Sequence, residues 1–218
     1  VEWPEFIEAL EKRLNLKIDA DENKVLGFLI DNSHLGVANQ HKFSEFLKAF
    51  GPLTYGGLDC IKNMKLTLRE KWFYGFLSKV ESEHLLAGQE SGTYLIRFSK
   101  SRAGSFAIAF VSKAKVYHIL INTCKPVGFK VYENQTKTEK TFRSLLEIVK
   151  AYEYALKKPL LTSLPFESWF WGDTTTMESA ELLQGKPSGS FLVRFSSSQP
   201  GNYAVSYVSP NHQIRHLN

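Results

Sequence analysis

The sequence of 218 residues predicts an α+β protein with an N-terminal helical region and two copies of one helix-and-strand unit. Three observations support this fold class. Apolar residues recur at helical spacing before residue 68, a set of residues after it recurs at an offset of 97, and short apolar runs in each copy alternate with turns. The expected boundaries are 1–68 for the helical region, 69–162 for the first unit and 163–218 for the second.

Two amphipathic helices are expected in the helical region. Their apolar faces share the spacing of three or four residues that one side of a helix requires. The faces are Phe6, Ile7, Leu10 and Leu14 in one helix, and Phe43, Phe46, Leu47 and Phe50 in the other. The second helix should end at Gly51-Pro52, because proline cannot continue a helix.

The segment between these helices, 31–42, has the length and part of the pattern of an EF-hand calcium loop. Asp stands first, Ser third and Gly sixth. However, the fifth position is Leu35, and the twelfth, which needs a bidentate carboxylate, is Lys42. Because a cation at that position repels calcium, we expect an EF-hand-like loop that binds no metal.

An internal repeat begins at residue 72. Trp-Phe-Tyr-Gly at 72–75 matches Trp-Phe-Trp-Gly at 169–172, and nine of twenty positions are identical between 92–111 and 189–208. A capping box, Ser or Thr followed three residues later by Glu, starts a helix in each copy. These boxes are Ser78 with Glu81 and Thr175 with Glu178. The constant offset of 97 indicates a duplicated unit.

Three strands are expected in the first unit, at about 93–99, 105–112 and 115–121, in an antiparallel sheet. Period two places Leu95, Arg97 and Ser99 on one face of the first strand, and Tyr94, Ile96 and Phe98 on the other. Both faces are apolar enough to require a helix on each side. A second helix is expected from Phe142 to Tyr152, after a polar loop from Val131 to Thr141.

An arginine stands in the middle of the first apolar strand of each unit, Arg97 in one and Arg194 in the other. A desolvated guanidinium costs several kcal/mol unless an anion meets it. A single strand arginine is as often structural as functional, but here it recurs with Ser two residues later, at Ser99 and Ser196. The recurrence favours an anion site.

Other polar residues of the first unit fit the same site. Ser101 and Arg102 follow in a turn whose amides can bind an oxyanion, Lys79 begins the capped helix, and His118 interrupts the third strand. Taken alone, Lys79 is more often a surface charge and His118 a core histidine. Together with Arg97 and Ser99 they suit a dianion with several oxygens, which is what a phosphate monoester presents.

The residues from Trp72, through Gly-Thr-Tyr-Leu-Ile-Arg-Phe-Ser at 92–99, to Tyr117-His118 resemble the Src-homology-2 (SH2) domain, a phosphotyrosine-binding module. The resemblance implies that Arg97 grips the phosphate in a bidentate contact. It also implies that Ser99 and Ser101 bind phosphate oxygens, that Lys79 is the basic residue of the first helix, and that His118 lines the phosphotyrosine ring. Arg102, in the turn, is counted with these phosphotyrosine-binding residues. In the second unit the resemblance assigns these roles to Arg194, Ser196, Ser198 and His216.

The second unit departs from the family pattern. Thr176 stands where the first unit has the basic Lys79, so we expect a weaker pocket. The sequence ends at Asn218, before the family's later loops and second helix, so the second unit is expected to be incomplete and the chain to be a fragment of a longer protein. Segments 2–10 and 43–52 are similar to the helical, calcium-loop-like region that precedes the SH2 domain in Cbl proteins, although the altered calcium loop departs from Cbl. STAT transcription factors have a comparable helical linker, and Arg-Phe-Ser at 97–99 resembles their sequence.

The leading functional expectation is a non-enzymatic tandem module that binds tyrosine-phosphorylated proteins or peptides, including a bis-phosphorylated ligand, without a cofactor. The alternatives are a transcription-linked reader, similar to STAT or to the tandem SH2 region of an elongation factor, the targeting part of a larger kinase or ubiquitin ligase, and a bacterial effector. No nucleophile–base pair indicates catalysis.

Bulk composition narrows the partners and the compartment. A balance of 27 basic to 22 acidic residues makes nucleic acid an improbable partner, and no apolar run is long enough for a membrane span. Two cysteines do not form a disulfide scaffold, so a cytoplasmic location is expected, with the nucleus or a host-cell cytosol left open.

Overall fold

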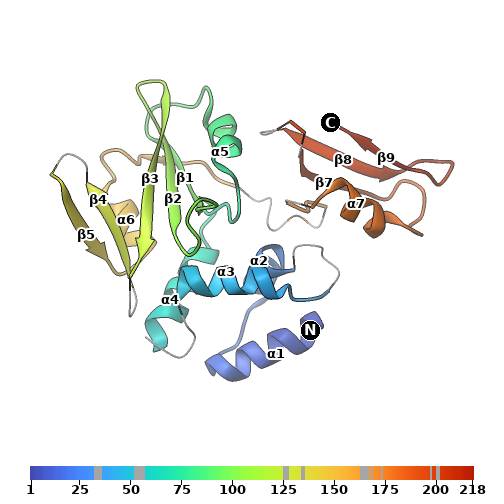
Figure 1. The fold of residues 1–218 in the computed structure, drawn as a ribbon, viewed down its shortest axis with the longest axis horizontal. Coiled ribbons are helices and arrows are strands. Elements are labelled where there is room, and N and C mark those ends of the chain that lie inside the picture. The colour runs from blue at the N-terminus through green and yellow to red at the C-terminus, as the bar shows by residue number, and fades with distance from the viewer. Residues whose placement is uncertain are drawn as a thin grey trace.

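The computed structural model describes residues 1–31, 36–51, 57–124, 128–133, 136–162, 167, 169–172, 174–196, 198–199 and 202–218, leaving out the side chains of 57–62. Three groups of elements follow one another along the chain (Figure 1). Four helices come first, a mixed sheet with helices on both faces follows, and a smaller sheet with one helix ends the chain. This arrangement confirms the predicted α+β class.

The helical region consists of α1 (Trp3–Leu14), α2 (Ala20–Ile30), α3 (Gln40–Phe50) and α4 (Gly57–Leu68). The two predicted amphipathic faces are those of α1 and α3, which bury Leu10, Leu14, Phe46 and Phe50. Helix α2 was not predicted as a separate element. Its apolar residues lie close together near its C-terminal end, and Val25, Leu26, Leu29 and Ile30 are all buried.

The predicted EF-hand-like loop falls between α2 and α3. Asp31 accepts a hydrogen bond of 2.9 Å from the amide of Gly36 through Oδ2, whereas the third and fifth positions lie outside the described residues. The last three positions belong to α3, whose N-cap is Asn39. Lys42, at the twelfth position, lies over the ring of Phe76, with Nζ 4.9 Å from its centroid. This lysine therefore contacts the first unit.

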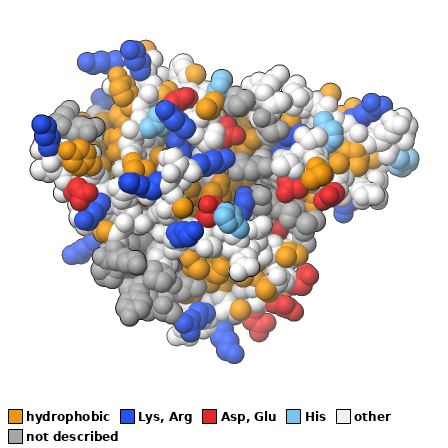
Figure 2. Space-filling model, viewed as in Figure 1, with side chains coloured by type: hydrophobic (Ala, Val, Ile, Leu, Met, Phe, Trp, Pro, Cys, Tyr) orange, Lys and Arg blue, Asp and Glu red, His pale blue; other side chains and the backbone are white. Residues whose placement is uncertain are grey.

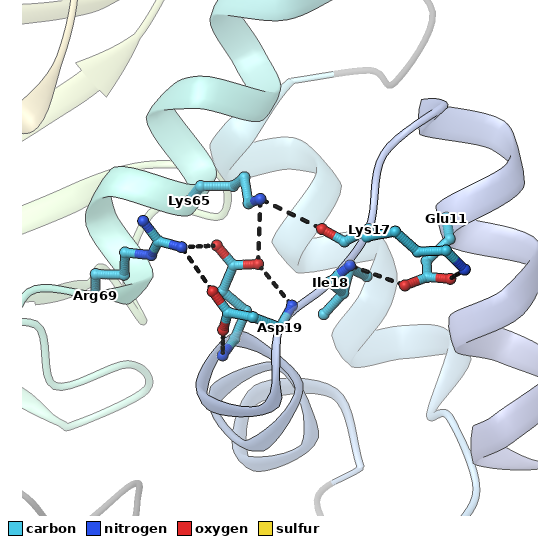
Figure 3. A network of polar contacts seen from close by, with 7 residues as sticks. Glu11, Lys17, Ile18, Asp19, Lys65 and Arg69 are labelled. Carbon is cyan, nitrogen blue, oxygen red and sulfur yellow. Dashed lines mark hydrogen bonds and ion pairs between the residues drawn. The ribbon is translucent and has the colours of Figure 1, made fainter.

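Polar contacts join α1, α2 and α4 at one end of the helical region (Figure 3). Arg69 donates a hydrogen bond of 2.6 Å to Oδ2 of Asp19, the N-cap of α2. The buried carboxylate of Glu22 forms ion pairs with Arg69 at 3.1 Å and with Lys65 at 3.3 Å. Glu11 of α1 accepts a hydrogen bond of 2.8 Å from the amide of Ile18, which fixes the connection between α1 and α2.

The first unit contains a six-stranded sheet in the order β5-β4-β3-β2-β1-β6. Its elements in chain order are α5 (Lys79–Leu86), β1 (Thr93–Phe98), β2 (Phe106–Ser112), β3 (Lys115–Thr123), β4 (Phe129–Glu133), β5 (Thr138–Phe142), α6 (Leu145–Ala151) and β6 (Lys158–Pro159). Every pair is antiparallel except β1 with β6.

The prediction of a polar loop at 131–141 is wrong. Strands β4 and β5 form a hairpin there, paired from Phe129 with Phe142 to Glu133 with Thr138. Because β5 is an edge strand held by backbone hydrogen bonds and its first four residues are exposed, it lacks the apolar alternation that marks a strand. Phe142 accordingly ends β5, and helix α6 begins three residues later, after the N-cap Ser144.

The alternation predicted for β1 is confirmed. Leu95 packs with Leu77 and Leu86 of the α5 side, whereas Tyr94, Ile96 and Phe98 belong to a larger core. That larger core includes buried residues of α1–α4 and α6, so the helical region and the first unit share one apolar interior. At its centre the ring of Phe50 from α3 meets Phe106 edge-on, with centroids 5.4 Å apart.

The second unit repeats the first half of this architecture. Helix α7 (Thr176–Leu183) is followed by β7 (Phe191–Phe195), β8 (Tyr203–Val208) and β9 (Ile214–Leu217) in one antiparallel sheet. The strand registers agree between the units, since Arg97 lies opposite Ala107 and Arg194 lies opposite Ala204. Most of the short segment 162–168, which we expect from the sequence to separate the two units, lies outside the described residues.

The ring of Phe28 from α2 contacts both units. It stacks on Phe170 with centroids 5.9 Å apart. A Cβ atom on Gly75 would lie 3.3 Å from this ring and 2.7 Å from Leu29, and one on Gly172 would lie 2.9 Å from the same ring. These are the last residues of the two repeated Trp-x-x-Gly segments, and both have positive φ, +61° and +52°. Helix α2 therefore packs against the same turn of each repeat.

Candidate binding sites of the two units

Arg97 lies in the interior between β1 and α5, and its side chain is held by weak acceptors. The residue is 5% exposed. Its Nε donates a hydrogen bond of 3.3 Å to the hydroxyl of Ser82, and its Nη1 donates one of 3.0 Å to the carbonyl oxygen of Phe98. Burial lowers the pKa of the guanidinium, and the charges of Glu83 and Glu81 act in the opposite direction. The charge of Arg97 is thus desolvated without a carboxylate partner among the described residues.

The turn after β1 places hydroxyls and amides beside Arg97. Ser99 Oγ lies 3.2 Å from Ser101 Oγ and accepts a hydrogen bond of 3.2 Å from the amide of Arg102. The side chain of Arg102 turns to β3, where Nη1 donates a hydrogen bond of 2.9 Å to Asn122. The structure therefore groups the hydroxyls of Ser99 and Ser101, whereas the guanidinium of Arg102 is bonded to Asn122 of β3.

Lys79 and His118 meet at a third side chain, Glu83. The Nε2 atom of His118 lies 3.0 Å from Oε1 of Glu83, and Nζ of Lys79 lies 3.7 Å from the same oxygen. Burial lowers the pKa of His118, the hydrogen bond to Glu83 raises it, and the charge of Arg97 lowers it again. The predicted residues Lys79 and His118 are therefore brought together, with an acidic residue between them.

The second unit repeats the arginine with different partners. Arg194 is 2% exposed and donates from Nη1 to the carbonyl oxygen of Phe195 at 3.1 Å and from Nη2 to Oγ1 of Thr176 at 2.7 Å. Its Nε is buried without a hydrogen-bond partner among the described residues. Burial lowers the pKa of this guanidinium.

The turn after β7 has the same hydrogen bonds as the turn after β1. Ser196 Oγ lies 3.3 Å from Ser198 Oγ and accepts from the amide of Gln199 at 3.1 Å. His216 lies on the exposed strand β9, where Nδ1 is 2.8 Å from the hydroxyl of Ser206. Burial, followed by the charge of Arg194, lowers its pKa. The four residues predicted for the second unit are thus arranged around the end of β7 and its neighbouring strands.

Four residues at these sites were missed by the sequence analysis or given no contact there: Ser82, Glu83, Thr176 and Ser206. A signal for Ser82 was present, because Glu-Ser recurs at 81–82 and 178–179. The spacing of four residues between Lys79 and Glu83 also indicates an ion pair on one helix face. No signal could reveal Ser206, which replaces Ala109 of the first unit and donates to Ser179 at 3.0 Å.

A groove of about 620 Å³ lies beside β3 of the first unit, and its walls come from β2, β3, β4, β5 and the segment 152–156 that follows α6. Most of its lining is apolar or aromatic, and its polar residues are Ser112, Glu133 and Lys140. The apolar and aromatic lining includes Phe110, Tyr117, Ile119, Tyr132, Tyr154 and Leu156. Tyr154 is 70% exposed, so this surface presents aromatic area to solvent.

The family model of the SH2 domain matches residues 72–152 and 169–218. The chain belongs to the SH2 domain family. Each match includes a buried strand arginine, Arg97 or Arg194, and the serine-containing turn that follows it. SH2 domains are non-catalytic modules that bind tyrosine-phosphorylated peptides in signalling proteins.

Curated proteins that the SH2 chain resembles are larger signalling proteins. The E3 ubiquitin-protein ligase cblA of Dictyostelium discoideum is 32% identical over 73% of this chain and 23% of its own length. The tyrosine-protein phosphatase corkscrew of Drosophila melanogaster is 32% identical over 67% of this chain and 18% of its own. The dual specificity protein kinase shkC of Dictyostelium discoideum is 39% identical over 52% of this chain and 22% of its own length. The SH2 chain thus spans about a quarter or less of each relative. Among its described residues, no helix has the length and apolar character needed to cross a membrane.

Proposed function

We propose that this chain recruits tyrosine-phosphorylated proteins through two SH2 pockets, in which Arg97 and Arg194 grip the phosphate. The observation that carries the proposal is the burial of these two guanidinium groups together with their hydrogen-bond partners. Both are almost fully buried, and among the described residues they bond only to hydroxyls and carbonyl oxygens. A phosphate dianion would supply the missing negative charge and accept two parallel hydrogen bonds from one guanidinium.

The remaining predicted residues complete this proposal. Ser99 and Ser101 in the first pocket, and Ser196 and Ser198 in the second, would donate hydroxyl hydrogen bonds to phosphate oxygens. Lys79 would add a positive charge at the start of α5, where the helix macrodipole also favours an anion. His118 and His216 would line the phosphotyrosine ring. Arg102 would contribute by holding the hydroxyl of Ser99, to which its backbone amide donates at 3.2 Å, since its side chain is bonded to Asn122.

The groove beside β3 would bind the residues that follow the phosphotyrosine in the first unit. Its aromatic and aliphatic walls favour apolar side chains, because burying them releases about 25 cal/mol for each Å² of apolar surface. A peptide with apolar residues after the phosphotyrosine should therefore bind the first pocket more tightly than one with acidic residues there.

We also propose that a bis-phosphorylated ligand engages both pockets. Residues 69–162 and 163–218 follow one another directly in the chain, and both contact Phe28 of the helical region 1–68. Because both pockets belong to one chain, the second binding event would be intramolecular, and a fixed relative orientation would make affinity depend on the spacing of the two phosphotyrosines. Equal affinity at every spacing would show that the two units bind independently.

The chain itself would act as a non-catalytic targeting part. Its relatives are a ubiquitin ligase, a phosphatase and a kinase, and the chain covers only a small part of each. The helical region would be the Cbl-like platform of the first SH2 domain, and the location would be cytoplasmic. On the face shown in Figure 2, the Lys and Arg side chains of the described residues are spread out and form no continuous basic patch there for nucleic acid.

Calorimetric titration with one peptide in three forms tests this function. The phosphotyrosyl form should bind, whereas the unphosphorylated and phosphoseryl forms should not, because a short phosphoserine cannot reach the buried arginine. Equal affinity for all three forms would refute the proposal.

A further inference from the structure

The carboxylate of Glu83 lies between Lys79 and His118 of the first pocket. Its Oε1 atom is 3.0 Å from Nε2 of His118 and 3.7 Å from Nζ of Lys79. The charge of Glu83 also raises the pKa of Arg97, against the lowering by burial. Lys79 and His118, which are proposed to surround the phosphotyrosine, therefore already contact one carboxylate.

The contact with His118 has a defined direction. An ionised carboxylate only accepts hydrogen bonds, so the proton of the neutral imidazole lies on Nε2 and is donated to Glu83. The other nitrogen, Nδ1, is buried and has no hydrogen-bond partner among the described residues. Glu83 thus holds the single N–H donor that His118 would offer to a ligand.

The second unit lacks this carboxylate. The residue equivalent to Glu83, at the offset of 97, is Ala180, and the residue equivalent to Lys79 is Thr176. His216 bonds instead to the neutral hydroxyl of Ser206 at 2.8 Å. The two pockets therefore differ by a complete cation–anion pair, and not only by the missing lysine.

We propose that Glu83 is an internal competing anion, which lowers the affinity of the first pocket for phosphotyrosine and must leave Lys79 and His118 when the phosphate enters. This inference rests on the proposed function of the pocket. The carboxylate is able to leave, since its side chain is 41% exposed. The repulsion between a carboxylate and a phosphate a few ångströms apart is only partly screened at such a site.

The test measures the first pocket alone. A phosphotyrosyl peptide is titrated into the Arg194→Ala variant and into the same variant with Glu83→Gln. Glutamine keeps the shape and one acceptor but removes the charge. We expect the double variant to bind about two- to tenfold more tightly, the range for a partly exposed charge interaction.

The matched control is Glu90→Gln in the same Arg194→Ala background. It makes the same change in net charge, but Glu90 pairs with Lys158 at 3.2 Å, away from the pocket, and its side chain is 79% exposed. Affinity should change less than twofold. The reciprocal variant, Ala180→Glu in an Arg97→Ala background, should weaken the second pocket.

If the Arg194→Ala variant binds the phosphotyrosyl peptide, the proposed function stands. In that case two results for the added Glu83→Gln substitution overturn the inference, an unchanged affinity or a lower one. If the Arg194→Ala variant binds no phosphotyrosyl peptide, the proposed function of the first pocket fails and the inference fails with it. Titration of His118 by NMR gives a second readout. The pKa of His118 should fall in the Glu83→Gln variant because the carboxylate raises it, and an unchanged pKa would show that the contact is absent in solution.

Discussion

The Nη2 atom of Arg194 donates a hydrogen bond of 2.7 Å to Oγ1 of Thr176, at the helix position that Lys79 occupies in the first unit. Threonine is short enough for its hydroxyl to approach the guanidinium, whereas the side chain of Lys79 is 65% exposed and pairs with Glu83. The first turn of the helix therefore places a different chemical group near each of the two arginines. In the second unit it supplies a neutral acceptor, and in the first unit it supplies a cation.

Replacing Thr176 by lysine should strengthen the second pocket. In an Arg97→Ala background, Thr176→Lys adds a positive charge beside the proposed phosphate and frees one N–H group of Arg194. We expect an affinity gain of about two- to fivefold for a phosphotyrosyl peptide, measured by calorimetry. Thr176→Ser, which keeps the acceptor, is the control and should leave affinity within twofold. A lysine variant that binds more weakly would show that the hydroxyl is needed in the complex.

Methyl groups at Gly75 and Gly172 should be poorly tolerated. Each glycine has positive φ, and a Cβ atom there would lie under 3.0 Å from a side chain of α2. Gly75→Ala and Gly172→Ala should each lower the free energy of unfolding by about 2–4 kcal/mol, combining backbone strain with overpacking.

Gly88 and Gly185 separate these two causes. Their φ values, +73° and +72°, are also positive, but a Cβ atom would meet nothing within 4 Å. Alanine at either position should therefore cost only the backbone strain, about 1–2 kcal/mol in denaturant unfolding. If all four variants lose the same stability, close packing against α2 contributes nothing.

Acid should weaken the contact between α2 and α4 through Asp19. The amide of Glu22 and then the guanidinium of Arg69 hold the pKa of Asp19 below its ordinary value. A folded-state pKa below the unfolded value stabilises the protein above the unfolded pKa, and this stabilisation is lost as pH falls through the folded pKa.

The variant Asp19→Asn tests this contact. Its free energy of unfolding should depend less on pH than that of the wild type between about pH 5 and pH 2. Asp21→Asn, which makes the same charge change outside this network, should keep the wild-type slope. A wild-type slope in Asp19→Asn as well would exclude the contribution of Asp19.

The sequence could indicate a candidate site in the first unit because its key residues recur. Arg97 and Ser99 are repeated as Arg194 and Ser196 at one offset, and strand alternation places both pairs on the face of the capped helix. Duplication thus supplied a comparison within a single chain. It also supplied the difference at Thr176, although not the hydrogen bond that this residue makes.

Elements whose position depends on tertiary contacts could not be predicted in this way. Strand β5 is a polar edge strand, and its backbone pairing with β4 requires no alternation of apolar residues that the sequence could show. The role of Phe28 depends on two glycines, Gly75 and Gly172, that are distant in the chain. The bond between Ser206 and His216 likewise arises from strand register, which brings the two residues opposite each other.

The most direct measurement is calorimetric titration of a singly phosphorylated tyrosyl peptide into the wild type, Arg97→Ala, Arg194→Ala and the double variant. Each single variant should lose one binding site, at a cost of about 2–5 kcal/mol for that site, and the double variant should bind no peptide. Arg97→Lys, which keeps the charge but not the bidentate geometry, should also bind weakly. A double variant that retains wild-type stoichiometry and affinity would contradict the assignment of both arginines to the phosphate.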